Sequence, residues 1–211
     1  MKKLNIGIIG SGAIGGLLGK RWAAAGHQVM YSSRNPEKLK PLAAEAGVNA
    51  HVGTVEEAAE FGDIVVLAIN YGTLNQAKVQ LGNRLDGKIV IDTTNPIVRT
   101  GEGGYRTLKK AGKTAGEVMA DYFPKTTIIK SFTTLWSEYL KNDAFKEQDP
   151  LVMPVSGDDP AAKELVTELV KQTGFLPYDV GGLKDSSIQD PGSPAWNVRL
   201  TQKEFEALLV A

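Results

Sequence analysis

The glycine-rich segment Gly10-Ser11-Gly12-Ala13-Ile14-Gly15 constrains the fold of this chain more than any other stretch of its sequence. An apolar run at residues 4–9 precedes it, which is typical of a strand. After it, apolar residues recur at helical spacing, at Ile14, Leu17, Leu18, Trp22 and Ala25. Because a G-x-G-x-x-G pattern is informative only between a strand and a helix, this context predicts a nucleotide-binding β-α-β unit.

Each glycine of the turn has its own physical role in such a unit. Gly10 permits the tight turn, Gly12 lets the backbone approach a pyrophosphate, and Gly15 lets the helix pack against the strand. The pyrophosphate would rest on free N–H groups at the start of the helix. We therefore expect dinucleotide contacts from Gly10, Ser11, Gly12, Ala13, Ile14 and Gly15. A turn whose glycines serve packing alone is the alternative.

The rest of the chain alternates between the two kinds of secondary structure. Strands are predicted at 27–31, 49–52, 64–69, 89–91, 126–130, 151–153 and 176–180. Helices are predicted after Asn35, where Pro41 delays or kinks the helix, after a capping box of Thr54 and Glu57, at 114–122, and from Asp159 to Gly174. This alternation predicts an α/β fold, a doubly wound parallel sheet of the NAD(P)-binding Rossmann type with a small C-terminal α/β extension.

The length of 211 residues suits one domain. We expect residues 1–211 to form a single NADP-binding unit, with a nucleotide core at 1–130 and an extension at 131–211 that completes an acceptor pocket. The glycine-rich stretch at 99–105 is expected to be a surface excursion, a mobile flap being the alternative. The tail at 185–197 should be irregular.

The amino-acid composition limits the classes of molecule that this protein is expected to bind. The 24 basic and 24 acidic residues leave no net charge, which argues against nucleic-acid binding and a polybasic membrane surface. Cysteine is absent, which excludes disulfides and thiol catalysis. The first residues run directly into the first strand, and no apolar run reaches membrane-spanning length, so a cytoplasmic, soluble protein is expected. Four C-terminal aromatics are compatible with a homodimer: Trp136, Phe145, Trp196 and Phe205.

The end of the second strand indicates which dinucleotide is bound. An acidic residue there would bind the ribose 2′-hydroxyl and repel a 2′-phosphate, and this chain has none. Ser32, Ser33 and Arg34 instead offer hydroxyl donors and a permanently charged guanidinium, which suit a phosphate. We therefore predict NADP(H) rather than NAD(H). A solvated loop arginine is the alternative for Arg34.

Parallel strands place their carboxyl ends at the ligand edge of the sheet. Further cofactor contacts are therefore expected from Ala68, Asn70, Tyr71, Asn95 and Pro96. The two histidines, His27 and His51, open strands at the other edge, and no catalytic side chain or metal site is predicted. A nicotinamide site without a proton donor suits hydride transfer to a flavin-like ring, against which the segment 132–136 would pack.

Several motifs in chain order resemble one known family. They are the segment from Gly10 to Gly15, then Ser32-Ser33-Arg34-Asn35-Pro36, Lys130-Ser131-Phe132-Thr133-Thr134, Gly157-Asp158-Asp159, and Asp179-Val180-Gly181-Gly182-Leu183. Over nearly its whole length the chain resembles the NADP oxidoreductase, coenzyme F420-dependent family. It is also similar to the cytoplasmic reductase domain of the Steap metalloreductases.

The resemblance implies hydride exchange between NADPH and the deazaflavin coenzyme F420. It also implies that Ser11, Ser33 and Arg34 hold the 2′-phosphate. Archaeal members tend to carry histidine where Thr133 stands, so the acceptor side departs from the pattern. A reductase of another small substrate and a non-enzymatic NADP(H)-binding sensor are the alternatives. The β-hydroxyacid dehydrogenases share the turn, but their helical second domain does not fit the length that remains.

Overall fold

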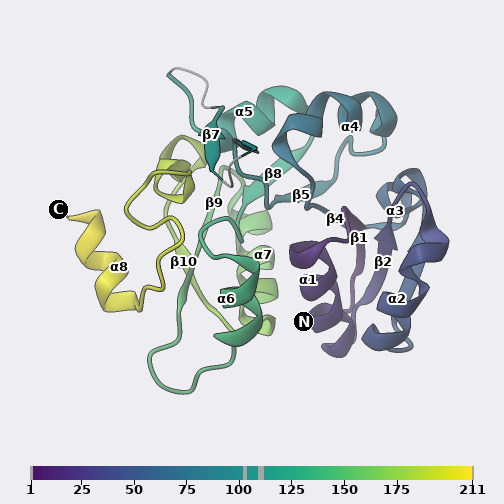
Figure 1. The fold of residues 1–211 in the computed structure, drawn as a ribbon, viewed down its shortest axis with the longest axis horizontal. Helices are drawn as coiled ribbons and strands as arrows, with labels where there is room; N and C mark the ends of the chain where they lie inside the picture. The colour runs from purple at the N-terminus through teal and green to yellow at the C-terminus, as the bar shows by residue number, and fades with distance from the viewer. Residues whose placement is uncertain (1, 102–103, 109–111, 211) are drawn as a thin grey trace.

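The computed structural model describes residues 2–101, 104–108 and 112–210. In these residues the chain builds one eight-stranded sheet with the order β10-β9-β8-β5-β4-β1-β2-β3, and helices cover it (Figure 1). The strands are β1 (Asn5–Ile9), β2 (Gln28–Ser32), β3 (Ala50–Gly53), β4 (Ile64–Leu67), β5 (Ile89–Asp92), β8 (Thr127–Lys130), β9 (Val152–Gly157) and β10 (Leu176–Asp179). The predicted α/β fold is therefore confirmed.

Six neighbouring strands of this sheet, in the spatial order β8-β5-β4-β1-β2-β3, run parallel, as predicted. The extension departs from this pattern, because β9 pairs antiparallel with β8, through Ile129 opposite Gly157 and Lys130 opposite Ser156. β10 then pairs parallel with β9. The sheet is thus parallel as predicted except at the β8–β9 pairing, whose direction the sequence did not indicate. An antiparallel neighbour needs no crossover over the sheet, and a short apolar run carries no information on strand direction.

Helices pack on both faces of the sheet. One face carries α1 (Ala13–Ala24), α2 (Lys40–Ala46), α6 (Ser137–Asn142) and α7 (Pro160–Gln172), and the other carries α3 (Val55–Phe61), α4 (Leu74–Leu81) and α5 (Ala115–Tyr122). Each face has its own cluster of buried apolar side chains, and in the first the buried Trp22 indole donates to the carbonyl of Leu169 at 3.0 Å. Two covered faces explain why the central strands are apolar throughout.

The helix starts follow their local sequence signals. Thr54 and Glu57 form the predicted capping box, and Thr114 and Glu117 form a second one. Pro41 lies in the first turn of α2, behind the short 3-10 helix η1 (Pro36–Leu39), so the helix begins late and is not kinked. None of the helices within the described ranges is long and apolar enough to cross a bilayer.

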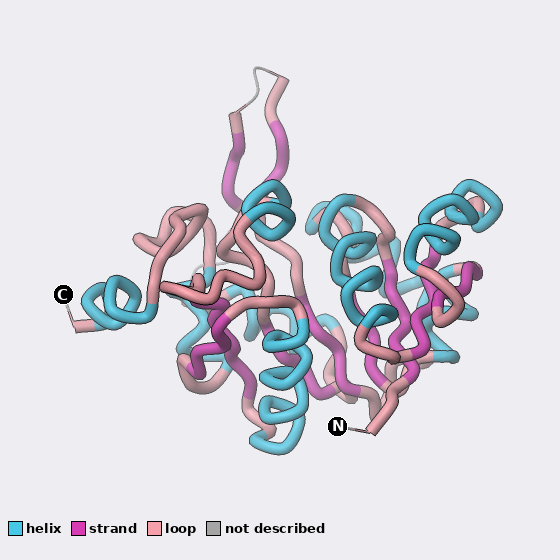
Figure 2. The backbone as a smooth tube through the Cα atoms, turned by 90° about the horizontal axis from the view of Figure 1, so that it is seen from below, coloured by secondary structure: helices cyan, strands magenta, loops and turns pink. Residues whose placement is uncertain are grey.

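The stretch at 99–105, which was expected to be a surface excursion, connects the two strands of a β-hairpin that was not predicted. β6 (Ile97–Arg99) pairs antiparallel with β7 (Tyr105–Thr107), and the pair projects from the body of the molecule (Figure 2). The tip residues 102–103 lie outside the described residues. The hairpin escapes prediction because each strand has three residues, fewer than a periodic pattern requires.

The C-terminal tail is more ordered than expected. It contains the 3-10 helix η3 (Leu183–Gln189) and ends in α8 (Gln202–Leu209), which the sequence reading missed. Phe205 of α8 is buried, and its ring lies 5.0 Å from that of Tyr178. The aromatic side chain of Phe205 therefore belongs to the core, while Trp136 and Phe145 are exposed.

His27 makes the stability of this fold depend on pH. The residue is 3% exposed, its Nδ1 accepts from the Leu4 amide at 3.1 Å, and its Nε2 lies 2.9 Å from the Gln172 side-chain oxygen. Because Nδ1 is an acceptor, the ring is neutral with its proton on Nε2. Burial lowers the pKa of His27 below its ordinary value, and the hydrogen bond to Gln172 opposes this in part.

We expect acidification to destabilise the protein through His27. As pH falls from about 7 to about 5, the unfolded chain binds a proton that the folded chain resists, so the free energy of unfolding decreases. The substitution His27→Gln should make this decrease smaller. Urea unfolding of both proteins at the two pH values measures it, and equal decreases would contradict the assignment.

Candidate functional site

The carboxyl ends of five neighbouring parallel strands meet at one edge of the sheet. In spatial order these are the ends of β2, β1, β4, β5 and β8. The residues for which cofactor contact was predicted all lie in the segments that follow these strands, except Ser32, which is the last residue of β2. An edge of this kind, where the strand order reverses beside β1, is where ligands bind in open α/β sheets.

The glycine turn after β1 has the geometry that a pyrophosphate site requires. Gly10 has a φ of +97°, and a Cβ there would lie 2.4 Å from the carbonyl oxygen of Ala68. A Cβ at Gly15 would lie 2.1 Å from the carbonyl oxygen of Gly10. At Gly12 a Cβ would meet no described atom within 4 Å, so the space in front of the helix start is open. Because no side chain caps α1 there, its first amides remain available to an anion.

Ser11 joins the β1 turn to the end of β2. Its Oγ accepts from the Ser32 amide at 3.1 Å and donates to the Ser32 carbonyl at 3.2 Å. The hydroxyl of Ser32 itself is buried and donates to the carbonyl of Ile8 at 2.7 Å. The side chain of Ser32 therefore stabilises the strand pairing, and only its backbone lies at the predicted site.

Ser33 and Arg34 lie at the edge, beyond the last residue of β2. The Oγ of Ser33 accepts from the Asn35 amide at 3.0 Å, which leaves its O–H free to donate. Arg34 is exposed, and the described residues provide its guanidinium with no ion-pair partner. The nearby carboxylate of Glu37 is paired with Lys40 at 2.6 Å. An unpaired guanidinium and a hydroxyl donor thus stand next to the glycine turn, and this donor set fits a phosphate.

The segment after β4 packs against the glycine turn. Ala68 donates its amide to Ile9 at 2.8 Å, and its side chain lies beside Gly15. Asn70 is exposed and begins the 3-10 helix η2 (Tyr71–Thr73). Tyr71 is half-buried, and burial, together with the neighbouring charges of Asp92 and Asp190, raises its pKa to about 12. The tyrosine is therefore a neutral group at neutral pH.

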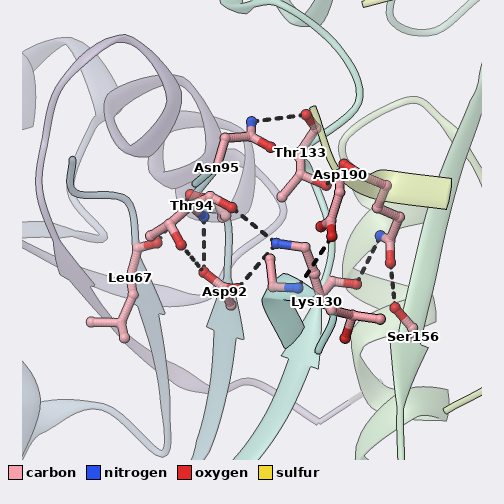
Figure 3. Close-up of polar contacts among 12 residues, drawn as sticks. Leu67, Asp92, Thr94, Asn95, Lys130, Thr133, Ser156 and Asp190 are labelled. Carbon is pink, nitrogen blue, oxygen red and sulfur yellow. Dashed lines mark hydrogen bonds and ion pairs between the residues drawn. The ribbon is translucent and has the colours of Figure 1, made fainter. Parts of the chain in front are cut away.

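The sequence reading missed a buried ion pair between the ends of β5 and β8. The Nζ of Lys130 lies 3.2 Å from Oδ2 of Asp92, and both side chains are 0% exposed (Figure 3). The two residues face each other in the strand register. Their sequence signal is weak, because each is simply the charged residue that ends an apolar strand.

Asn95 and Pro96 follow this pair. The Asn95 amide nitrogen donates to the Thr133 carbonyl at 3.0 Å, while its Oδ1 is buried and has no partner among the described residues (Figure 3). Pro96 is buried and accepts from the Leu108 amide at 2.7 Å, which ties the hairpin to this edge. Asn95 thus presents an unused acceptor atom at the ligand edge.

The segment at 132–136, which was expected to pack against the acceptor, divides between the core and the ligand edge. Phe132 has a φ of +59° and is fully buried, with its ring 5.9 Å from that of Trp22 beneath α1. Thr133 and Thr134 are buried, and Trp136 is half-exposed. Phe132 therefore belongs to the core, which leaves the threonines and Trp136 as the candidates for contact with an acceptor.

The fold and this edge define a dinucleotide-binding protein of the Rossmann type. A family model described as NADP oxidoreductase, coenzyme F420-dependent, matches residues 5–96, which confirms the predicted resemblance over that span. The match extends from the first residue of β1 to Pro96. It therefore includes the glycine turn, the end of β2 and the Asn95–Pro96 segment.

Individual proteins extend the similarity beyond that span. The chain is 29% identical over 200 residues to the metalloreductase STEAP3 of Rattus norvegicus, covering 92% of this chain and 38% of the relative. It is 28% identical over 184 residues to the F420-dependent NADP reductase of Methanocaldococcus jannaschii, covering 81% of each. A crystal structure of a hypothetical protein from Sinorhizobium meliloti superposes with a TM-score of 0.82 and 29% identity, over 95% of this chain and 96% of that one. The chain is thus similar to proteins that are named as reductases, and it spans little more than a third of the length of the metalloreductases that it matches.

Substitutions at two glycines of the turn should separate ligand binding from folding. In Gly12→Ala the methyl group enters open space, so we expect a stability loss of at most about 1 kcal/mol, for alanine at an N-cap, and an NADPH affinity at least about tenfold weaker. In Gly15→Ala the methyl group meets the Gly10 carbonyl, and a loss of about 1–3 kcal/mol in stability should result. Thermal unfolding and NADPH titration measure both effects. Wild-type affinity in Gly12→Ala would exclude the turn as the pyrophosphate site.

Proposed function

We propose that this protein transfers a hydride between NADPH and a flavin-like acceptor, with coenzyme F420 as the first candidate. The observation that carries the proposal is the end of β2, where the free guanidinium of Arg34 and the hydroxyl of Ser33 stand beside the glycine turn. No acidic residue occupies the position that would select a 2′-hydroxyl.

The geometry of the turn supports a single extended ligand across the edge. Ser11 bonds both groups of the Ser32 backbone, so the pyrophosphate site on α1 and the 2′-phosphate site after β2 are fixed relative to each other. From there the edge runs past β4 to β5 and β8. Neighbouring strands are about 4.8 Å apart, so β2 and β5 are separated by about 14 Å. We place the nicotinamide at the far end of this path, near Asn95.

The side chains at the far end would mainly bind, orient and exclude water. The threonines at 93, 94, 133 and 134 are buried there, and Asp92 and Lys130 neutralise each other. When bound, NADPH supplies a hydride from its nicotinamide ring. An acceptor ring that holds the resulting charge within its own π-system needs little from these residues beyond correct placement. This requirement supports a flavin-like acceptor over an alcohol or ketone.

The relatives support F420 as the first acceptor to test. One of them is named an F420-dependent NADP reductase and matches this chain over 81% of both lengths. Another is named a metalloreductase, but this chain spans only 38% of its length. The experiment is anaerobic oxidation of NADPH, followed at 340 nm, with F420, FMN or FAD as the acceptor. Absence of turnover with all three would reject the proposed reaction.

Removal of the Arg34 guanidinium should change cofactor preference. In Arg34→Ala we expect NADPH affinity to fall about 10- to 100-fold, since hydrogen bonds to charged groups contribute about 1.5–3 kcal/mol, while NADH affinity stays the same. Isothermal titration of both cofactors measures the ratio. Arg84→Ala is the matched control, because Arg84 is paired with Glu60 at 2.8 Å near the other end of the strands. Equal wild-type affinities for NADPH and NADH would contradict the NADP(H) assignment.

A homodimer remains part of the proposal on narrower grounds. Of the four aromatics that suggested it, Trp136 is 49% exposed and Phe145 is 64% exposed, while Phe205 is buried. Only the exposed side chains are available to a second copy. A sedimentation coefficient that stays monomeric at all concentrations would remove this part of the proposal.

A further inference from the structure

The buried pair of Asp92 and Lys130 needs an explanation beyond stability. Both side chains are wholly inaccessible, and the distance between Nζ and Oδ2 is 3.2 Å. Removing two charges from water is costly, and a pair of apolar residues of similar volume often serves a core equally well. A buried ion pair is therefore better explained by a specific arrangement that it enforces.

The bonds of the pair converge on a single residue of the ligand edge. The Lys130 ammonium also donates to the carbonyl of Thr94 at 2.9 Å. Oδ1 of Asp92 accepts from the amide of Thr94 at 2.9 Å and from its hydroxyl at 2.7 Å. The ammonium and the carboxylate together hold the amide, the carbonyl and the side chain of Thr94 (Figure 3).

Asn95 is the next residue, and its side chain is fixed as a consequence. Its amide nitrogen donates to the carbonyl of Thr133, which follows β8 three residues after Lys130. Its Oδ1 is left buried, without a partner among the described residues. A buried acceptor without a donor is unfavourable in the free protein. The arrangement is therefore suited to an N–H donor that arrives with a ligand.

Lys130 is also anchored from the C-terminal extension. Its backbone carbonyl accepts from the side-chain amide of Gln189 at 3.1 Å, and the same amide donates to the carbonyl of Pro154 at 2.9 Å. The Ser156 hydroxyl donates to the Gln189 side-chain oxygen. Gln189 is 0% exposed, so the end of β8 is held on the side away from Asp92 as well.

We propose that Lys130 and Asp92 are positioning residues that hold the Thr94–Asn95 backbone so that Oδ1 of Asn95 accepts a hydrogen bond from the carboxamide N–H of the nicotinamide. The inference rests on the proposed function, because it assumes that NADP(H) lies across this edge. The adenosine end of the cofactor would lie at β2, four strand spacings from β8, or about 19 Å. The pair should therefore act on one end of the cofactor and leave the other unchanged.

Two probes distinguish binding of the adenosine end of the cofactor from binding of its nicotinamide end: 2′,5′-ADP, which lacks the nicotinamide, and NADPH. In Lys130→Met we expect the Kd of 2′,5′-ADP to stay within about twofold of wild type, while the Kd of NADPH rises about tenfold, the size of one lost hydrogen bond. The fluorescence of bound NADPH should fall toward that of the free cofactor. Asn95→Ala should give the same pattern, and combining it with Lys130→Met should add little, since both remove one contact.

The matched control is Lys88→Met. Lys88 also donates to backbone carbonyls, at 2.8 Å to Ala59 and 2.7 Å to Gly62, near the opposite edge of the sheet. The substitution Lys88→Met should lower the stability of the protein and leave its affinities for 2′,5′-ADP and NADPH unchanged. Where Lys130→Met does not fold, Asp92→Asn/Lys130→Met leaves no lone buried charge and takes its place in the same titrations.

The possible results lead to different conclusions. Selective loss of NADPH affinity and fluorescence supports the positioning role. Equal weakening of both probes, or wild-type NADPH binding in a folded variant, overturns it and leaves the pair a structural feature. Failure of the wild-type protein to bind either probe overturns the proposed function itself.

Discussion

The close contact between α1 and the sheet is the constraint on which the rest of the structure depends. The helix lies against β1 and β2 on a row of glycines, and a Cβ at Gly19 would lie 2.5 Å from the side chains of both Ile8 and Tyr31. Only residues without side chains permit this distance. The contact fixes the axis of the helix, so its amino end stands directly beyond β1 and opens onto the ligand edge. The hydroxyl of Tyr31 completes it by donating to the Gly16 carbonyl at 3.1 Å.

Local signals predicted the parts of the molecule that local interactions determine. The glycine turn and the Thr54 capping box each depend on residues a few positions apart, and each was predicted correctly. For α2 the sequence left a late start or a kink open, and the structure has the late start. The Asp92–Lys130 pair was not predicted, because the two residues are 38 positions apart and meet only through the pairing of β5 with β8. The direction of β9 was missed for a related reason, since it depends on the path of the preceding connection and not on the strand's own sequence. The helix α8 was missed because Phe205 is its one buried residue, too few for a periodic pattern.

The two halves of the edge differ in how their chemistry is supplied. The half that faces the predicted pyrophosphate and 2′-phosphate uses backbone amides and polar side chains that follow β1 and β2, and it lies inside the span that matches the family model. The half around β8 uses buried side chains that bond to one another, and Lys130, Ser156 and Gln189 all lie beyond that span. The span that matches the family model therefore covers the first half of the edge and only residues 92–96 of the second.

The position of Gln189 also determines the order in which the molecule is completed during synthesis. The glycine turn is closed by contacts with Ser32 and Ala68, so the chain holds everything that this half requires once its first third has been made. The end of β8 is held by the side chain of Gln189, which lies 59 positions after Lys130. The same side-chain amide group also bonds to Pro154 and Ser156 of β9. Because the chain is made from its N-terminus, the residues that close the nucleotide turn are all present before Gln189 is made. A nascent chain would then contain the residues of the glycine turn before the contacts that hold the end of β8 can form.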